Sequence, residues 1–191
     1  MFAPAYPIET ERLLLRPFAQ GDYDALLAIQ SRADVTRFLY WEPRTPDEVL
    51  PALERRIADA ALWQEGDTLG CAVVLRTTGE LIGDCSLHWV SAEHRVGEIG
   101  FVFHPDHHGR GYATEAARPL LEFGFATVGL HRIIGRLEAR NVASARVLEK
   151  LGMRREALLI ENEFVKGEWQ SELDYAILDR EWRALRATRA A

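Results

Sequence analysis

The sequence predicts one α/β domain, in which a mixed, mostly antiparallel sheet of six or seven strands carries helices on both faces. Three observations lead to this prediction. Strand-like segments joined by short turns follow one another in the middle of the chain. Strands alternate with helices in its second half. A length of 191 residues, with 48% hydrophobic and 27% charged residues, suits a single domain with its own core.

The N-terminal part of the chain is predicted to form one strand and two helices. The strand is RLLLRPF, residues 12–18, and the first helix is GDYDALLAIQS, residues 21–31. The second helix covers residues 45–64 and has the clearest start signal. Thr45 is placed to cap it, a proline occupies its first position, and Glu48 completes a capping box.

The middle and C-terminal parts are predicted to supply the rest of the sheet. Alternating polar and apolar residues indicate an antiparallel meander of three strands, over residues 69–76, 81–90 and 96–103. The chain is then predicted to form a helix over residues 112–128, a strand over 132–139 and a short helix over 143–151. A long hairpin over residues 157–178, which turns at Lys166 and Gly167, and a basic terminal helix over 179–191 are predicted to follow.

Charge and composition exclude several classes of protein. The formal net charge of −6 argues against a general nucleic-acid binder, which is normally basic on at least one face. Cys71 and Cys85 lack metal-type spacing and are expected to be buried thiols on neighbouring strands. The N-terminus lacks the pattern of a signal peptide, and no apolar run approaches the roughly 20 residues of a membrane span. A cytoplasmic protein is therefore expected.

The segment HPDHHGRGYATEA, residues 104–116, places two glycines between a strand and a helix. Gly109 and Gly111 have no Cβ, so the backbone can approach a ligand closely. The helix that follows offers unpaired N–H groups and a partial positive charge, which suit a phosphate. A G-x-G turn alone is more often a simple turn, and both interpretations stay open here. Walker-loop and dinucleotide-fingerprint residues are missing, so a phosphate site here favours the diphosphate of another carrier.

Three histidines in the same segment raise the alternative of a metal site. His104, His107 and His108 lie within one short loop, and the sequence offers no distant fourth ligand. His-Pro-Asp is also common turn chemistry. No metal is therefore expected.

Several further segments, in order along the chain, match one known family. They are TERLLLRPF, GEIGFVFHP, GRGYATEA, GLHRI, RNVASARVLEKLGM and GEW, the last followed by YAIL and EW. Together they resemble the Gcn5-related N-acetyltransferases (GNAT), and within them the branch of ribosomal-protein N-terminal alanine acetyltransferases (RimJ/RimL-like). The resemblance spans residues 8–183, taken as one N-acetyltransferase domain. The family's coenzyme A loop, Gln/Arg-x-x-Gly-x-Gly/Ala, aligns with residues 106–111 and departs from the pattern at Asp106.

The resemblance implies transfer of acetyl from acetyl-CoA to a primary amine. The acceptor is expected to be a peptide N-terminus or a small amine such as a polyamine or an antibiotic. A longer acyl donor is also compatible with the sequence. The alternative is a module that binds coenzyme A without turnover, because two expected catalytic groups are absent or weakly indicated. Neither nucleic acid nor membrane is an expected partner, and the long hairpin offers an edge for a homodimer.

The resemblance also assigns the residues that would hold acetyl-CoA. The pantetheine arm is expected to lie along the strand end formed by Phe101, Val102 and Phe103, as an added strand. The diphosphate is expected on the backbone of His108, Gly109, Arg110, Gly111, Tyr112, Ala113 and Thr114. Asn141 is expected to contact the cofactor while capping a helix, and Arg110, Arg146 and Lys150 are candidate phosphate partners, although each is equally typical of a solvated surface charge.

Two residues are candidates for catalysis. Glu98 lies on the strand face opposite Ile99, and is predicted to act as general base, with a solvated strand carboxylate as the equally open alternative. Many family members use a tyrosine where this chain has Leu148, so Ser144 is the candidate hydrogen-bond donor to the leaving thiol. Its alternative is a purely local role in the first turn of a helix.

Aromatic residues are weaker candidates for the acceptor site. Trp41, Trp89 and Trp169 are candidates to line the acceptor pocket, although single aromatics more often belong to the core.

Overall fold

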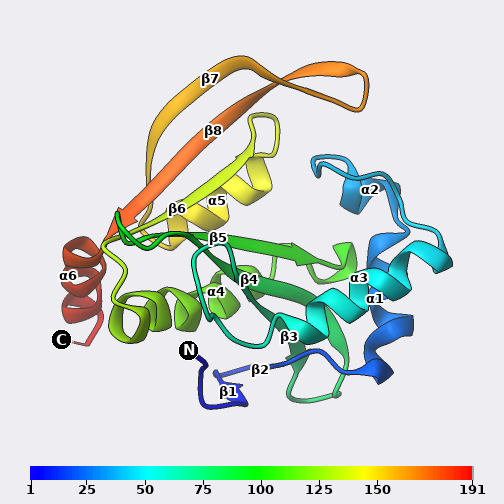
Figure 1. Cartoon of the computed structure of the whole chain (residues 1–191), viewed down its shortest axis with the longest axis horizontal. Helices are drawn as coiled ribbons and strands as arrows, with labels where there is room; N and C mark the ends of the chain where they lie inside the picture. The colour runs from blue at the N-terminus through cyan, green and yellow to red at the C-terminus, as the bar shows by residue number, and fades with distance from the viewer. Residues whose placement is uncertain (191) are drawn as a thin grey trace.

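The computed structural model, which describes residues 1–190, contains one mixed sheet of eight strands (Figure 1). Their order across the sheet is β1-β2-β3-β4-β5-β6-β8-β7, and every neighbouring pair is antiparallel except β5 and β6. The strands are β1 (Ile8–Glu9), β2 (Leu13–Arg16), β3 (Thr68–Leu75), β4 (Leu81–Ser91), β5 (Val96–Phe103), β6 (Arg132–Glu138), β7 (Arg154–Val165) and β8 (Glu168–Leu178). The predicted mostly antiparallel sheet is confirmed. The strand beyond the predicted six or seven is β1, which at two residues is too short to show an alternating pattern.

Helices cover both faces of this sheet, as predicted. They are α1 (Tyr23–Gln30), α2 (Ala33–Thr36), α3 (Pro46–Ala58), α4 (Tyr112–Phe123), α5 (Val142–Lys150) and α6 (Asp179–Ala190). α4 runs on as one turn of π-helix to Val128. The four-residue α2 was not predicted, and α3 ends at Ala58, well before the expected end at residue 64.

The predicted start of α3 is confirmed in atomic detail. The carboxylate of Glu48 accepts hydrogen bonds from the backbone N–H of Thr45 at 2.8 Å and from its hydroxyl at 3.0 Å. Pro46 occupies the first helical position, where its missing N–H removes no helical hydrogen bond. This start therefore follows from residues three positions apart in the sequence.

Two apolar clusters hold the layers together. The larger one lies between the sheet and α4, α5 and α6, and its fully buried members include Leu87, Leu120 and Ile133. The smaller one packs α1 and α3 on the opposite face, through residues such as Leu26 and Leu53. The core is thus continuous beneath α4, and it fixes the position of the helix whose N-terminus follows the glycines.

The two cysteines lie directly opposite each other on β3 and β4. Cys71 and Cys85 are paired positions in the strand register, and both are buried free thiols, as predicted. Burial raises the pKa of the Cys71 thiol to about 11. A buried thiol with a raised pKa stays protonated, so these cysteines are core residues rather than nucleophiles. Among residues 1–190, no helix has the length and apolar content that crossing a bilayer requires.

The sheet opens between β5 and β6. These parallel strands pair only where Val96–Glu98 faces Arg132–Ile134. Beyond that point β5 stays paired with β4 as far as Phe103, while β6 stays paired with β8 as far as Glu138. One edge of β5 is therefore left without a partner strand in the described chain, and a wedge opens in the middle of the sheet.

The β7–β8 hairpin extends from the body of the sheet towards α2 (Figure 1). Its turn lies at Lys166 and Gly167, as predicted, and both residues have positive φ. The ammonium group of Lys166 donates a 2.7 Å hydrogen bond to the carbonyl oxygen of Thr36, the last residue of α2. The hairpin is thereby tied to a segment 130 residues earlier in the chain.

Candidate active site

The N-terminus of α4 presents unpaired N–H groups. Gly109 and Gly111 have φ values of +74° and +82°, in the left-handed region where other residues are strained. Gly111 is the N-cap of α4, and its carbonyl oxygen accepts the N–H of Glu115 at 3.0 Å. The N–H groups of the first three helical residues therefore have no helical acceptor. They carry the positive end of the helix dipole, which makes them suited to an anion.

A side chain from another part of the chain fixes this loop. The guanidinium of Arg12 donates to the carbonyl oxygen of Arg110 at 3.0 Å and forms an ion pair with Glu115 at 2.6 Å. It also lies 4.5 Å from the ring centre of Tyr112. Burial alone would raise the pKa of Glu115, but hydrogen bonds from Thr10 and Arg12 lower it. Arg12 is thus a positioning residue that sequence analysis missed.

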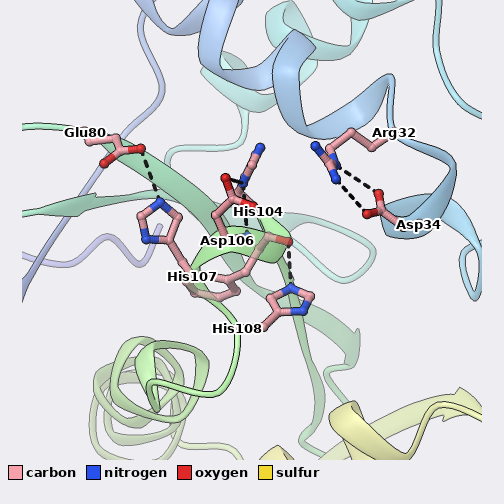
Figure 2. A network of polar contacts seen from close by, with 8 residues as sticks. Arg32, Asp34, Glu80, His104, Asp106, His107 and His108 are labelled. Atoms are coloured by element: carbon pink, nitrogen blue, oxygen red, sulfur yellow. Dashed lines mark hydrogen bonds and ion pairs between the residues drawn. The ribbon is translucent and has the colours of Figure 1, made fainter.

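The three histidines of the loop point to different partners rather than to a common point (Figure 2). His107 is 3.2 Å from the carboxylate of Glu80, and His108 is 3.0 Å from the carbonyl oxygen of Phe103. His104 accepts the backbone N–H of Asp106 at 3.3 Å. Within residues 1–190, no group of three His, Cys, Asp or Glu side chains is arranged to hold a metal ion. In this structure the histidines shape the loop.

A groove of about 530 Å³, which we call the α4 groove, runs from the wedge in the sheet to the N-terminus of α4. Its lining includes the predicted cofactor residues Phe101, Val102, Phe103, His108, Gly109, Gly111, Tyr112, Ala113, Thr114, Asn141 and Arg146. Lys150, the other predicted cation on α5, also lines it. Arg110 does not, because its side chain is exposed outside the groove and only its carbonyl oxygen is held, by Arg12.

Asn141 and Ser144 start α5 beside the wedge. The side-chain oxygen of Asn141 accepts the backbone N–H of Ser144 at 3.1 Å, which confirms Asn141 as the cap. This bond leaves the hydroxyl of Ser144 uninvolved in the cap. Leu148, where the family often has a tyrosine, is 2% exposed and offers no polar group.

A second cavity of about 280 Å³, which we call the hairpin cleft, lies beneath the β7–β8 hairpin. Its lining comes from strands β4 to β8, from the loop after α2, and from α3 and α5. It shares with the α4 groove the residues Phe38, Leu39, Phe101, Val102, Asn141 and Ser144. The two cavities therefore meet at the open edge of β5. Ser144 faces both.

Ion pairs neutralise most of the charges in the hairpin cleft. The carboxylate of Glu98 accepts two hydrogen bonds from Arg136, at 2.8 and 3.2 Å, and this pairing raises the pKa of the guanidinium. Asp84 pairs with Arg56 at 3.0 Å, and Glu138 pairs with Arg140 at 2.8 Å. Glu98 thus faces the cleft as predicted, with both of its oxygens engaged.

A group of residues at the hairpin side of the cleft was not predicted from the sequence. Glu172 on β8 is only 6% exposed, and one of its oxygens lies 3.4 Å from the hydroxyl of Tyr40. Burial raises the pKa of Glu172, and the nearby charge of Glu163 raises it further. The available signal was alternation on β8, which places Gln170, Glu172 and Asp174 on one face.

The tryptophans do not line either cavity. Trp169 is 60% exposed, and its ring makes an edge contact with Phe164. Trp89 makes an edge contact with Phe2. The guanidinium of Arg44 lies 4.4 Å from the ring centre of Trp41. The aromatic residues that reach the hairpin cleft are instead Phe38, Tyr40 and Phe101.

Comparison with known proteins identifies the family. A family model of the acetyltransferase (GNAT) domain matches residues 12–154, most of the chain, including the α4 loop. The chain belongs to the GNAT acetyltransferases. The uncharacterized N-acetyltransferase YnaD of Bacillus subtilis is 35% identical over 175 residues, which cover 92% of this chain and 98% of the relative.

Solved GNAT structures share the fold. An acetyltransferase of the GNAT family from Bacillus anthracis is 34% identical, with a TM-score of 0.81 over 91% of this chain and 98% of the other. The spermidine N-acetyltransferase of Vibrio cholerae, solved in complex with CoA and spermine, is 23% identical, with a TM-score of 0.76 over 91% and 99% of the two chains. The GNAT fold predicted for this sequence is therefore confirmed.

Proposed function

We propose that this GNAT protein moves acetyl directly from acetyl-CoA to a primary amine. The observation that carries the proposal is the junction of two cavities at the open edge of β5. One cavity ends at a helix N-terminus suited to phosphate, and the other is lined by carboxylates suited to an amine. Direct transfer needs the two reactants side by side, and positioning of this kind can supply about 7–11 kcal/mol of the barrier.

The lining of the α4 groove supports this proposal, because each part of it suits one part of the cofactor. The unpaired N–H groups that begin α4 would bind the diphosphate, with the cation of Arg146 near its charge. The backbone edge of β5 from Phe101 to Phe103 would pair with the amides of the pantetheine arm, as an added strand. The thioester would then reach the junction beside Ser144.

The hairpin cleft supports the amine chemistry. An ammonium group must first lose a proton, after which its lone pair attacks the thioester carbonyl and the C–S bond breaks. The leaving thiolate has a pKa near 8.5, so one hydrogen-bond donor such as the Ser144 hydroxyl gives it adequate help. Glu98 is the base predicted from the sequence, and Glu172 is a second carboxylate that faces the same cavity.

The cleft favours acceptors that carry positive charge, since carboxylates outnumber guanidinium groups along its lining. Polyamines and protein N-termini both fit this description. The relatives include the spermidine N(1)-acetyltransferase of Escherichia coli (strain K12), 24% identical over 171 residues. Membership of the RimJ/RimL-like branch, a cytoplasmic location and a homodimer stay predictions from the sequence.

The experiment that tests this function is a thiol-release assay with acetyl-CoA and a panel of amines. The panel contains spermidine, propane-1,3-diamine, an alanine-initiated peptide amide and an aminoglycoside. Release of coenzyme A that depends on both protein and amine is the expected result. Tight binding of acetyl-CoA with no release across the panel would instead support the non-catalytic module.

A further inference from the structure

The charges of the hairpin cleft do not balance. Arg56 pairs with Asp84, Arg136 pairs with Glu98, and Glu138 is held by Arg140 from outside the cleft. Each guanidinium that lines the cavity is thus already bound to a carboxylate. Of the described carboxylates that line it, Glu163 and Glu172 are the two that form no ion pair. Glu172 is the more deeply buried of the two.

Glu172 is buried, and within residues 1–190 it forms no ion pair. Its position on β8 is directly opposite Glu138 on β6, and like charges at opposed strand positions are unfavourable. One carboxylate oxygen receives only the long 3.4 Å contact from Tyr40, and the other accepts no hydrogen bond from residues 1–190. A buried carboxylate normally has a charged or hydrogen-bonding partner. Glu172 lines the cleft with no ion pair among the described residues and with one long hydrogen bond, from Tyr40.

The groups around Glu172 shift its pKa in both directions, and burial is the largest cause. Tyr40 faces it from the loop after α2, Glu163 from β7, Arg136 and Glu138 from β6, and Asp174 from β8 itself. Burial, followed by the charges of Glu163 and Asp174, raises the pKa of Glu172, while Arg136 and the hydrogen bond from Tyr40 lower it, and the net shift is upward. A carboxyl group with a raised pKa is a more effective proton acceptor near neutral pH.

We infer that Glu172 binds the ammonium group of the acceptor in the hairpin cleft and takes the proton that must leave before attack. This inference rests on the proposed function of the two cavities. The ammonium would supply the missing cation, and the proton would pass from its nitrogen to the Glu172 carboxylate. The nitrogen lone pair then forms the bond to the thioester carbon.

The remaining steps balance without another reactant. The C–S bond breaks as the tetrahedral intermediate collapses, and the sulfur leaves with the bonding electrons. The second proton of the nitrogen moves to this sulfur, which Ser144 is placed to contact. Protonated Glu172 then returns its proton to solvent. Glu98, bound by Arg136 through both oxygens, keeps that guanidinium in place rather than taking the proton.

The test is the pH profile of kcat/KM for Glu172→Gln, measured with spermidine or the alanine-initiated peptide amide, whichever the wild-type protein acetylates faster. At pH 7 the kcat/KM of the variant is expected to fall about 10²-fold, which is within the range for removal of a general base. Near pH 9.5 the loss is expected to fall below tenfold, because a larger fraction of the amine is already deprotonated. Binding of acetyl-CoA is expected to stay unchanged.

Two further variants make the result specific. For Glu98→Gln, kcat/KM at pH 7 is expected to fall less than tenfold. Glu168 is an exposed carboxylate at the start of β8, the strand that carries Glu172, and Glu168→Gln is expected to match the wild type. A loss at Glu172→Gln that is equal at all pH values would mean a structural role and overturn the inference. So would a larger loss at Glu98→Gln. An inactive wild-type protein would instead count against the proposed function itself.

Discussion

The α4 groove and the hairpin cleft meet at one strand edge but are built in different ways. The predicted phosphate end of the groove is made largely of backbone, from Phe103 to Thr114, with two glycines at positive φ. The cleft is made of side chains from eight separate segments, held by ion pairs and by the contact of Lys166 with Thr36. A backbone site leaves a contiguous signature in the sequence. A site of dispersed side chains does not.

The largest expected effect comes from Gly111→Val, which tests the backbone side of this comparison. A Cβ at this position meets only the Arg12 side chain, at 3.6 Å, so the protein itself has room for it. A β-branched residue at φ +82° is nevertheless strained, and the strain falls on the loop whose N–H groups would bind the diphosphate. Calorimetry is expected to show at least a 100-fold loss of affinity for acetyl-CoA.

Gly79→Val is the matched control for that prediction. Gly79 has φ +74° and open space around it, and it lies in the turn between β3 and β4. It carries similar strain away from the groove, so unfolding temperatures should fall by similar amounts in both variants while only Gly111→Val loses the cofactor. Equal affinity in the two variants would show that the glycine serves only the turn.

Ser144→Ala tests the junction of the two cavities. The cap of α5 uses the backbone N–H of Ser144, so this substitution removes the hydroxyl and keeps the helix start. A fall in kcat of about tenfold is expected, with unchanged affinity for acetyl-CoA, because a thiolate needs less stabilisation than the oxyanions for which one donor is worth 10²–10³. Stopped-flow thiol release measures it. An unchanged kcat would assign Ser144 a local role only.

Lys166→Ala tests how the hairpin closes the cleft. The substitution removes the hydrogen bond to Thr36, whose net worth is about 1 kcal/mol. The KM for the amine is expected to rise about fivefold, while affinity for acetyl-CoA stays the same because the α4 groove does not include the hairpin. A change in acetyl-CoA affinity of the same size would contradict the separation of the two sites.

The smallest expected effect is on stability. Because the pKa of Glu172 is raised in the folded protein, its ionised form is disfavoured there. Its contribution to stability is present below the unfolded pKa near 4.3 and is lost as the pH rises through the higher folded value. Glu172→Gln is therefore expected to raise Tm by a few degrees at pH 7.5 and to leave it nearly unchanged at pH 4. Differential scanning calorimetry at both pH values decides this.

The sequence was sufficient for the fold and for most of the α4 groove. Periodicity located the longer strands, and the glycines located the helix start, because both depend on neighbouring residues. It could not show that Arg12 holds the loop or that Glu172 comes to lie opposite Glu138, since these contacts join segments far apart in the chain. The sequence also could not show that the side chain of Arg110 is exposed beside the groove, because a sequence pattern does not give the direction of a loop side chain.

Calorimetric titration of the wild-type protein with acetyl-CoA tests whether the α4 groove binds the cofactor. We expect one acetyl-CoA to bind per chain with a micromolar dissociation constant, through the N-terminus of α4 and the open edge of β5. An absence of binding at millimolar acetyl-CoA would contradict this expectation, and the two glycines would then be no more than a turn.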